Sequence, residues 1–282
     1  MPIEHVGVIG AGTMGNGIAH VFASSGYQVT LCDVEQRFLD RALETIGRNL
    51  DREVAKGKTS AEDKTAALKR IVPALQRTQL ANCDFVIEAA TEKFEVKAEI
   101  FRDLDRICRA EVLLASNTSS ISITRLGAVT KRPAKIIGMH FFNPVPVMKL
   151  VEVIRGLATA QETFDTVRDL TLKLDKTPVE VNDAPGFVSN RVLMPLLNEA
   201  MFAVMEGVAT PQAVDEVFKL GMAHPMGPLT LADFIGLDVC LDIMRVLHDG
   251  LGDPKYRPCP LLIKMVDAGW LGKKSGRGFY TY

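Results

Sequence analysis

The stretch VGVIGAGTMGNGIAHVFASSGYQVTLCDVE, residues 6–35, decides the fold of the first half of the chain. Residues 5–9 form a short run of mostly apolar and β-branched residues, which predicts a buried strand. A G-x-G-x-x-G motif follows at once, and the pattern then predicts a helix over residues 13–24 and a strand over residues 28–32. A strand, glycine-rich turn, helix and strand within about thirty residues form the unit that binds a dinucleotide.

The motif consists of Gly10, Ala11, Gly12, Thr13, Met14 and Gly15. The first glycine suits a tight turn, the second lets the backbone approach a pyrophosphate, and the third lets the helix pack closely on the strand. The free N–H groups of the helix N-terminus favour phosphates. Asp33 follows the second strand, at the position where an acid binds the ribose of NAD. Arg37, four residues further on, could weaken the resulting preference for NAD over NADP. A structural turn without a ligand is the alternative.

Beyond this unit the sequence predicts an α/β fold of the Rossmann type, with a doubly wound and mainly parallel sheet. Apolar residues four apart, from Phe38 to Val54, predict a helix, and Ser60 can cap another, so a helical hairpin is inserted. Strands are then predicted over residues 85–89, 112–115, 136–139 and 150–154, alternating with helices. This alternation is typical of a parallel sheet with helices on its faces.

The pattern changes at the breaker cluster that begins with Asp183. We therefore expect one domain over residues 1–183 and an all-helical domain over residues 184–282. The predicted helices of the second domain cover residues 187–206, 211–220, 229–247 and 260–268.

Composition excludes several classes of protein. A net charge of -1 over 282 residues argues against a broad nucleic-acid surface. Five scattered cysteines without a C-x-x-C, and histidines without ligand spacing, indicate neither a disulfide framework nor a metal site. No signal peptide or membrane-spanning stretch is evident, so we expect a cytoplasmic protein.

Polar residues follow a predicted strand in ASNTSS, residues 115–120. Ligands of doubly wound sheets bind at the carboxyl ends of strands, so Asn117 and Ser119 are candidates for contacts to substrate or cofactor. Turn and helix-cap hydrogen bonds are the alternative.

A histidine and a glutamate stand in GMHFFNPVPVMKLVEV, residues 138–153. His140 ends an apolar strand, and Glu152 lies in a second apolar run, where a buried carboxylate needs a partner. Two adjacent strands joined through Asn143 and two prolines could bring Glu152 to the imidazole. A core histidine and an edge-strand glutamate are the alternative.

An amide side chain follows the domain boundary in APGFVSNRVLMPLLNEA, residues 184–200. Asn190 lies one turn into the predicted helix, where it could face a cleft between the domains or lie on the helix surface.

The glycine motif, NTSS, HFFNP, PGFVSNR and the C-terminal KSGRGFY occur in this order along the chain. With them the chain, from Val6 to Tyr280, resembles the 3-hydroxyacyl-CoA dehydrogenase family, in particular its short bacterial 3-hydroxybutyryl-CoA members. The resemblance implies an NAD-binding domain, an acyl-CoA substrate and a homodimer formed through the helical domain, and it adds to a composition that already argues against a membrane or nucleic-acid partner. It also implies a substrate cleft between the two domains.

The resemblance also implies roles for single residues. His140 becomes the general base, Glu152 its orienting partner, and Ser119 and Asn190 the groups that position the substrate. Lys56, on the hairpin, matches a CoA-binding lysine. Asp33 matches the residue that binds the adenosine ribose. The positions that match contacts to the nicotinamide half of NAD, or to the loops around it, are Glu92, Lys97, Ser119, Asn143 and Lys274.

One departure is Asn49, where the family often has serine, which puts one CoA contact in doubt. Two rival functions remain at this stage. One is a different β-hydroxyacid dehydrogenase that also joins a Rossmann domain to a helical one. The other is a non-catalytic dinucleotide-binding protein of the crystallin kind, against which the presence of Ser119, His140, Glu152 and Asn190 argues.

Overall fold

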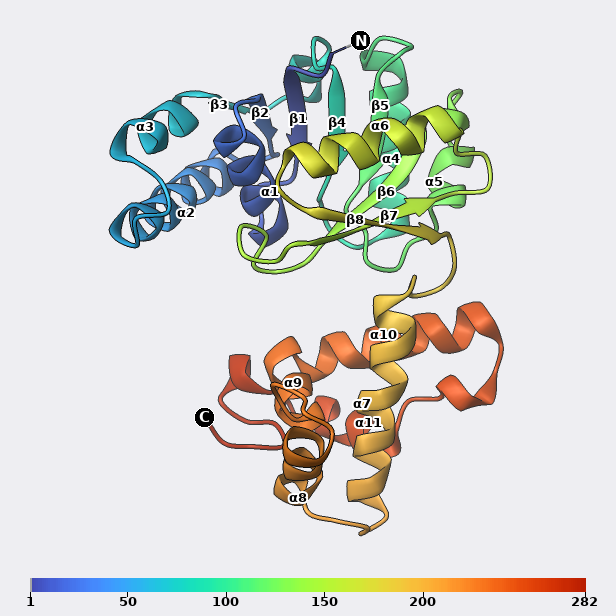
Figure 1. Cartoon of the computed structure of the whole chain (residues 1–282). Helices are drawn as coiled ribbons and strands as arrows, with labels where there is room; N and C mark the ends of the chain where they lie inside the picture. The colour runs from blue at the N-terminus through green and yellow to red at the C-terminus, as the bar shows by residue number, and fades with distance from the viewer. Residues whose placement is uncertain (1) are drawn as a thin grey trace. The chain divides into compact units, whose positions relative to one another are not determined.

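The computed structural model of the chain describes residues 2–282. These residues form two compact units, of which the first ends at Asp183 and the second is Ala184–Tyr282. An eight-stranded sheet lies in the first unit, whereas the regular structure of the second unit is almost entirely helical (Figure 1).

The sheet of the first unit has the strand order β3-β2-β1-β4-β5-β6-β7-β8. Neighbouring strands run parallel, except that β6 and β7 pair antiparallel. The predicted doubly wound, mainly parallel sheet is therefore confirmed. The strands are β1 His5–Ile9, β2 Gln28–Cys32, β3 Ile71–Ala74, β4 Phe85–Glu88, β5 Leu113–Ser116, β6 Ile136–Phe141, β7 Leu150–Arg155 and β8 Thr177–Asn182.

The helices of this unit connect the strands, and α2 and α3 form the expected hairpin, which Figure 1 shows projecting beside the sheet. Along α2 the residues Leu39, Ala42, Ile46 and Leu50 are buried, and the Ser60 hydroxyl caps α3 by accepting from the Asp63 N–H at 2.9 Å. The helices are α1 Thr13–Ser24, α2 Gln36–Ala55, α3 Ala61–Lys69, α4 Phe94–Ile107, α5 Ile123–Ala128 and α6 Gln161–Lys173.

Strand β3 is absent from the sequence prediction, which places no strand between the hairpin and residue 85. Only four residues long, β3 contains Pro73, which has no N–H to donate to a ladder. It is tolerated because β3 lies at the edge of the sheet and pairs with β2 alone.

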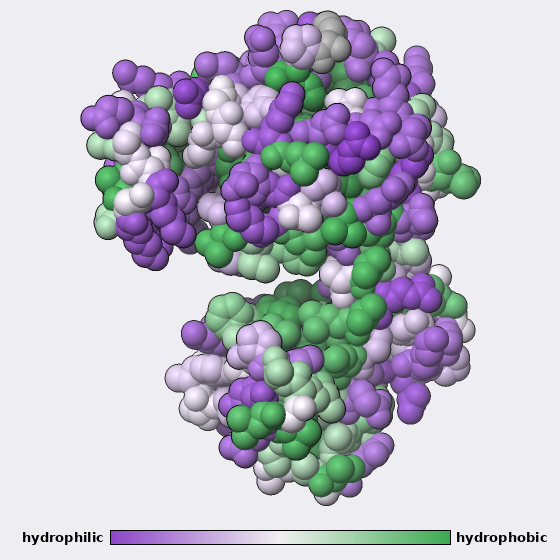
Figure 2. Space-filling view, viewed as in Figure 1, coloured by the Kyte–Doolittle hydropathy of each residue, from purple (hydrophilic) through white to green (hydrophobic). Residues whose placement is uncertain are grey.

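The second unit packs its helices around a core of its own, which includes Leu197, Leu229 and Leu241. The single helix predicted over residues 229–247 is wrong, because Gly236 takes a φ of 106° and separates two helices. Large apolar side chains stay exposed, among them Val208, Leu220 and Phe234, and Figure 2 shows apolar side chains on the visible face of this unit. The helices are α7 Ser189–Met205, α8 Pro211–Glu216, α9 Pro228–Ile235, α10 Leu237–Leu251 and α11 Pro260–Asp267.

Candidate active site

The glycine motif forms the turn from β1 into α1. Gly10 has a φ of 95°, which L-residues rarely adopt, and a Cβ there would lie 2.6 Å from the Ala89 carbonyl oxygen. A Cβ on Gly15 would lie 1.7 Å from the Gly10 carbonyl oxygen, whereas one on Gly12 would meet no atom within 4 Å. Gly10 and Gly15 are thus required by the fold. Gly12 leaves open space at the N-terminus of α1, where N–H groups favour an anion.

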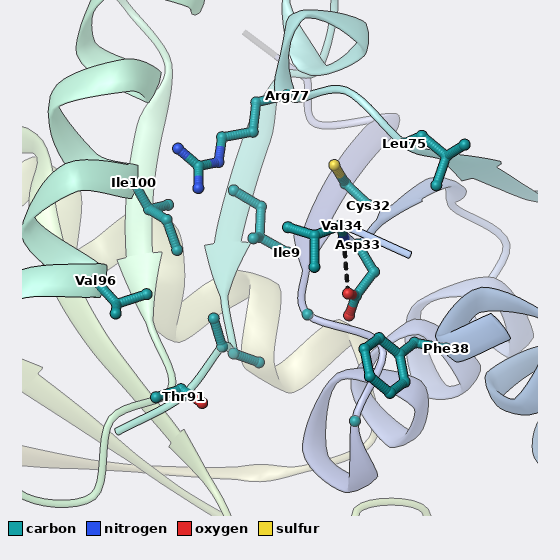
Figure 3. A pocket seen from close by; sticks show the side chains of 14 residues that line it. Ile9, Cys32, Asp33, Val34, Phe38, Leu75, Arg77, Thr91, Val96 and Ile100 are labelled. Carbon is teal, nitrogen blue, oxygen red and sulfur yellow. Dashed lines mark hydrogen bonds between the residues drawn. The ribbon is translucent and has the colours of Figure 1, made fainter. Parts of the chain in front are cut away.

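Asp33, just after β2, faces the same turn. One carboxylate oxygen accepts from the Ala11 N–H at 2.6 Å, and the other accepts from the Val34 N–H at 2.7 Å. Each oxygen keeps a lone pair for a further donor. Asp33 lines a pocket of about 560 Å³ together with Gly10, Gly12 and apolar side chains that include Phe38, Val96 and Ile100 (Figure 3). An acid beside apolar walls suits a ligand that carries both hydroxyl groups and an aromatic base.

His140 and Glu152 lie opposite each other in the antiparallel β6–β7 pair. The Nδ1 atom of His140 is 2.8 Å from a Glu152 oxygen, and the two residues are 8% and 2% exposed. Strand register therefore brings together two residues that are twelve positions apart. A carboxylate at Nδ1 fixes the proton there and directs the lone pair of Nε2 away from Glu152.

The loop after β5 carries Asn117 and Ser119. Asn117 accepts from the Phe141 N–H at 2.9 Å, which ties this loop to the strand that carries His140. The Glu92 carboxylate accepts from the Ser119 N–H at 2.9 Å and from the Ser120 N–H at 3.1 Å, and it lies 3.3 Å from the Ser119 hydroxyl.

The pKa of the Glu92 carboxyl group lies below the usual value of a glutamate. Burial works to raise its pKa, but the charge of Lys97 and the hydrogen bonds from Thr118 and Ser119 outweigh burial, so the pKa is lowered. Lys97 itself is 1% exposed and lies 3.3 Å from Glu92. The carboxylate is therefore a fixed acceptor for the loop that carries Ser119.

A second pocket, of about 420 Å³, lies beside the glycine turn. Its walls include Asn143, from the turn between β6 and β7, together with Arg41, Thr45 and Asn49 on one face of α2. Lys56 is exposed at the C-terminus of α2. The helical hairpin thus brings amide, hydroxyl and cationic groups to a groove that begins at the glycine turn.

Two candidate residues belong to the second unit. Asn190 lies in the first turn of α7, and its N–H donates to the Gly186 carbonyl at 3.1 Å. The Lys274 ammonium is 2.6 Å from a carboxylate oxygen of Asp238.

Glu88, at the end of β4, is a functional candidate that is not among the residues predicted from the sequence. Its carboxylate is fully buried and pairs with Lys97 at 2.7 Å. A charged residue that ends an otherwise apolar strand is the signal that could have found it, since a buried carboxylate needs a partner.

Among residues 2–282, no helix is both long enough and apolar enough to cross a membrane.

Comparison with known proteins gives matches over the whole chain. Residues 5–184 match the NAD-binding domain of 3-hydroxyacyl-CoA dehydrogenases, and residues 186–282 match their C-terminal domain. A probable 3-hydroxybutyryl-CoA dehydrogenase of Bacillus subtilis is 57% identical over 282 residues, which cover 100% of this chain and 98% of the relative. A 3-hydroxybutyryl-CoA dehydrogenase of Bradyrhizobium diazoefficiens is 56% identical over 99% of this chain and 96% of its own. The crystal structure of an (S)-3-hydroxybutyryl-CoA dehydrogenase from Ralstonia eutropha superposes with a TM-score of 0.97 at 50% identity, covering 100% of this chain and 99% of that one.

Proposed function

The chain belongs to the 3-hydroxyacyl-CoA dehydrogenase family, and we propose that it interconverts a short-chain (S)-3-hydroxyacyl-CoA and the 3-oxoacyl-CoA with NAD as cofactor. The preferred pair is 3-hydroxybutyryl-CoA and acetoacetyl-CoA, by analogy with the relatives named above. The observation that carries the proposal is the His140–Glu152 pair on the same sheet as the glycine turn.

The cofactor side of the proposal rests on fit. Gly12 leaves room for a pyrophosphate at the N-terminus of α1, and the carboxylate of Asp33 is held in place with acceptor capacity for ribose hydroxyls. A phosphate on that ribose would meet the charge of Asp33, so NAD is favoured over NADP. Arg37, which could attract such a phosphate, is 2.6 Å from Glu35. When bound, NAD accepts the hydride that leaves the 3-carbon of the substrate.

The proton side rests on the His140–Glu152 pair. His140 takes the proton of the 3-hydroxyl group as the hydride leaves, and it returns a proton to the oxygen in the reverse direction. Glu152 keeps the imidazole in one tautomer and offsets the charge that the ring gains. Ser119 and Asn190 hold the substrate oxygens, which positions the reacting carbon for hydride transfer.

The remaining candidate residues are proposed to anchor the two long ligands. Lys56 binds the CoA part at the C-terminus of α2, where it offers a cation to its phosphates. Glu92, Lys97, Asn117, Asn143 and Lys274 shape the surroundings of the nicotinamide half of NAD.

We further propose that the chain forms a homodimer through the second unit, whose exposed Val208, Leu220 and Phe234 would be covered in a dimer. We also propose a cytoplasmic location, where its five unpaired cysteines stay reduced. Sedimentation of the purified chain tests the dimer, and a monomer at micromolar concentration contradicts it.

NADH absorbance on adding acetoacetyl-CoA tests the function. We expect NADH to be consumed, with a lower kcat/KM when NADPH replaces it and when the acyl chain is lengthened. The same protein should leave free 3-oxo acids, which lack CoA, unreduced. Consumption of NADH only with 3-oxo acids that lack CoA would favour the other class of dehydrogenase, and no consumption with any of them would overturn the enzyme assignment.

A further inference from the structure

We propose that Glu88 is a positioning residue of this site: through Lys97 it sets the place of Glu92, which holds the Ser119 loop. The effect of Glu88 on catalysis rests on the function proposed above, whereas its effect on the loop does not. We define the Ser119 loop as residues 117–120, which follow β5.

Glu88 stands at the meeting point of three strands. In the sheet it pairs with Ile9, the residue before the glycine motif, and with Ser116, the residue before the Ser119 loop. Its side chain is fully buried, and both carboxylate oxygens are engaged. One oxygen accepts from the Ala90 N–H at 2.6 Å, and the other accepts from the Ser116 hydroxyl at 2.7 Å. Glu88 is thereby fixed relative to both ligand-facing turns.

Lys97, on α4, links this fixed carboxylate to Glu92. Its ammonium lies 2.7 and 3.0 Å from the two oxygens of Glu88 and 3.3 Å from an oxygen of Glu92. It also donates to the Ala90 carbonyl at 3.3 Å. An ammonium has three N–H donors, and these oxygens use them all. Because Lys97 is only 1% exposed, we infer that it acts on the site through Glu92 rather than by touching a ligand.

The second oxygen of Glu92 accepts the hydrogen bonds that hold the Ser119 loop. While one oxygen faces Lys97, the other accepts from the backbone N–H groups of Ser119 and Ser120 and from the Thr118 hydroxyl. The Lys97 ammonium is shared between the carboxylates of Glu88 and Glu92. Glu92 is therefore not drawn fully toward Lys97, and its other oxygen remains available to the loop. Without the charge of Glu88, the ammonium has a single carboxylate left to pair with. It is then drawn toward Glu92, because an uncompensated buried charge is costly. As Lys97 and Glu92 move closer together, the hydrogen bond between Glu92 and the Ser119 N–H weakens.

The alternative is that Glu88 and Lys97 only stabilise the fold. Buried ion pairs are weak stabilisers, since well-packed apolar residues of similar volume replace them at little or no loss of stability. A purely structural pair should therefore be replaceable by the uncharged residues Gln and Met without loss of activity. A positioning pair should not be.

The test compares Glu88→Gln with Asp105→Asn. Glu88→Gln keeps the shape of the side chain and removes its charge. Asp105→Asn does the same to another largely buried ion pair, with Arg132 at 2.8 Å, whose partners are 9% and 10% exposed and form hydrogen bonds with the backbone of Lys131, Arg109 and Cys108. Both variants are expected to lower Tm. Only Glu88→Gln should lower kcat for acetoacetyl-CoA, by about 10- to 100-fold, because small displacements of positioning groups have effects of this size.

Two further readouts separate positioning from stability. The KM for NADH should change by a smaller factor than kcat in Glu88→Gln, since the glycine turn and Asp33 are untouched and only the nicotinamide side, near Glu92, is displaced. The double variant Glu88→Gln with Lys97→Met removes both charges while the amide still pairs with the Ala90 N–H and the Ser116 hydroxyl, so it should regain much of the Tm lost in Glu88→Gln but not the kcat. A double variant that regains both, or a Glu88→Gln protein with the kcat of the wild type, overturns the proposal.

Hydrogen exchange of the Ser119 and Ser120 amides needs no substrate and tests the geometry directly. Both N–H groups donate to Glu92, so they should exchange faster in Glu88→Gln and at the wild-type rate in Asp105→Asn. Equal exchange in both variants contradicts the proposal. A wild-type protein that leaves acetoacetyl-CoA unreduced would instead remove the proposed function, and the exchange result would still decide whether Glu88 positions the loop.

Discussion

The turn from β1 into α1 and the antiparallel β6–β7 pair are two regions of the same unit, and each has a buried histidine beside it. His140 on β6 has a carboxylate oxygen of Glu152 at 2.8 Å, whereas His20 on α1 has its nearest carboxylate, Glu53, at 3.7 Å. Among residues 2–282, the Nδ1 atom of His20 meets no hydrogen-bond partner. Burial alone therefore does not distinguish the proposed catalytic histidine from His20, and the partner that fixes its tautomer is the better criterion.

The two regions also differ in what builds them. The β1–α1 turn offers backbone groups and empty space, which three glycines determine locally. The β6–β7 pair offers side chains that only strand register brings together. Substitutions should accordingly affect cofactor binding or folding in the first region and the chemical step in the second.

The largest effect is expected for His140→Asn. Removing a general base lowers kcat by about 10²–10⁴-fold, and the affinity for NADH should stay within about threefold because the glycine turn is intact. His20→Asn is the matched control, and its kcat should equal that of the wild type. Steady-state rates and NADH fluorescence titration measure both, and equal kcat values for the two variants would break the comparison.

Gly15→Ala should come next, as a folding defect. Its Cβ would lie 1.7 Å from the Gly10 carbonyl oxygen, and a backbone atom cannot move aside cheaply. We expect a loss of more than about 3 kcal/mol in the free energy of unfolding, measured by denaturant titration. A Gly15→Ala protein as stable as the wild type would show that the turn is looser than described.

Gly12→Ala should separate binding from folding. Its Cβ meets no atom within 4 Å, so the free energy of unfolding should change by less than about 0.5 kcal/mol. The methyl group would occupy the space for the pyrophosphate, so the Kd for NADH should rise about tenfold or more. If NADH bound equally well, the open space at Gly12 would not be its phosphate site.

The smallest effect concerns the pH dependence of stability. Burial lowers the pKa of His20 from the ordinary value of 6.5, and nearby Lys176 adds to this, while Glu53 opposes it. The folded state thus binds fewer protons than the unfolded chain, and the stability present above pH 6.5 falls as the pH drops below it. Between about pH 7.5 and 5.5 the unfolded chain takes up most of one proton at His20. If the folded chain takes up none, the loss is about 1.4 kcal/mol, which is its upper limit.

The comparison variant for this effect is His20→Gln, which carries no titrating ring. Its free energy of unfolding should fall less than that of the wild type over the same pH interval. Parallel pH profiles of the two proteins would mean that His20 does not titrate differently on folding.

The sequence predicts the first region well because its signals are local. The turn can be predicted from neighbouring residues alone: an apolar strand, three glycines and then Asp33. The sequence also places His140 and Glu152 near each other, but only register decides that they face one another. Strand β3 is missed because Pro73 hides it, and a helix is wrongly continued through Gly236, whose φ of 106° no periodicity reveals. Glu88 escapes notice because its partner Lys97 lies on the following helix and its second partner, Ser116, on another strand.

A double-mutant cycle on His140→Asn and Glu152→Gln tests most directly whether these two residues act as one catalytic unit. Glu152→Gln keeps the shape of the side chain and removes its charge, so it should lower kcat strongly by itself. The kcat for acetoacetyl-CoA reduction should be little lower in the double variant than in His140→Asn alone, because groups that act as a unit are not additive. All three variants should bind NADH as the wild type does. Losses that simply multiply in the double variant would contradict the account, since Glu152 would then act independently of His140.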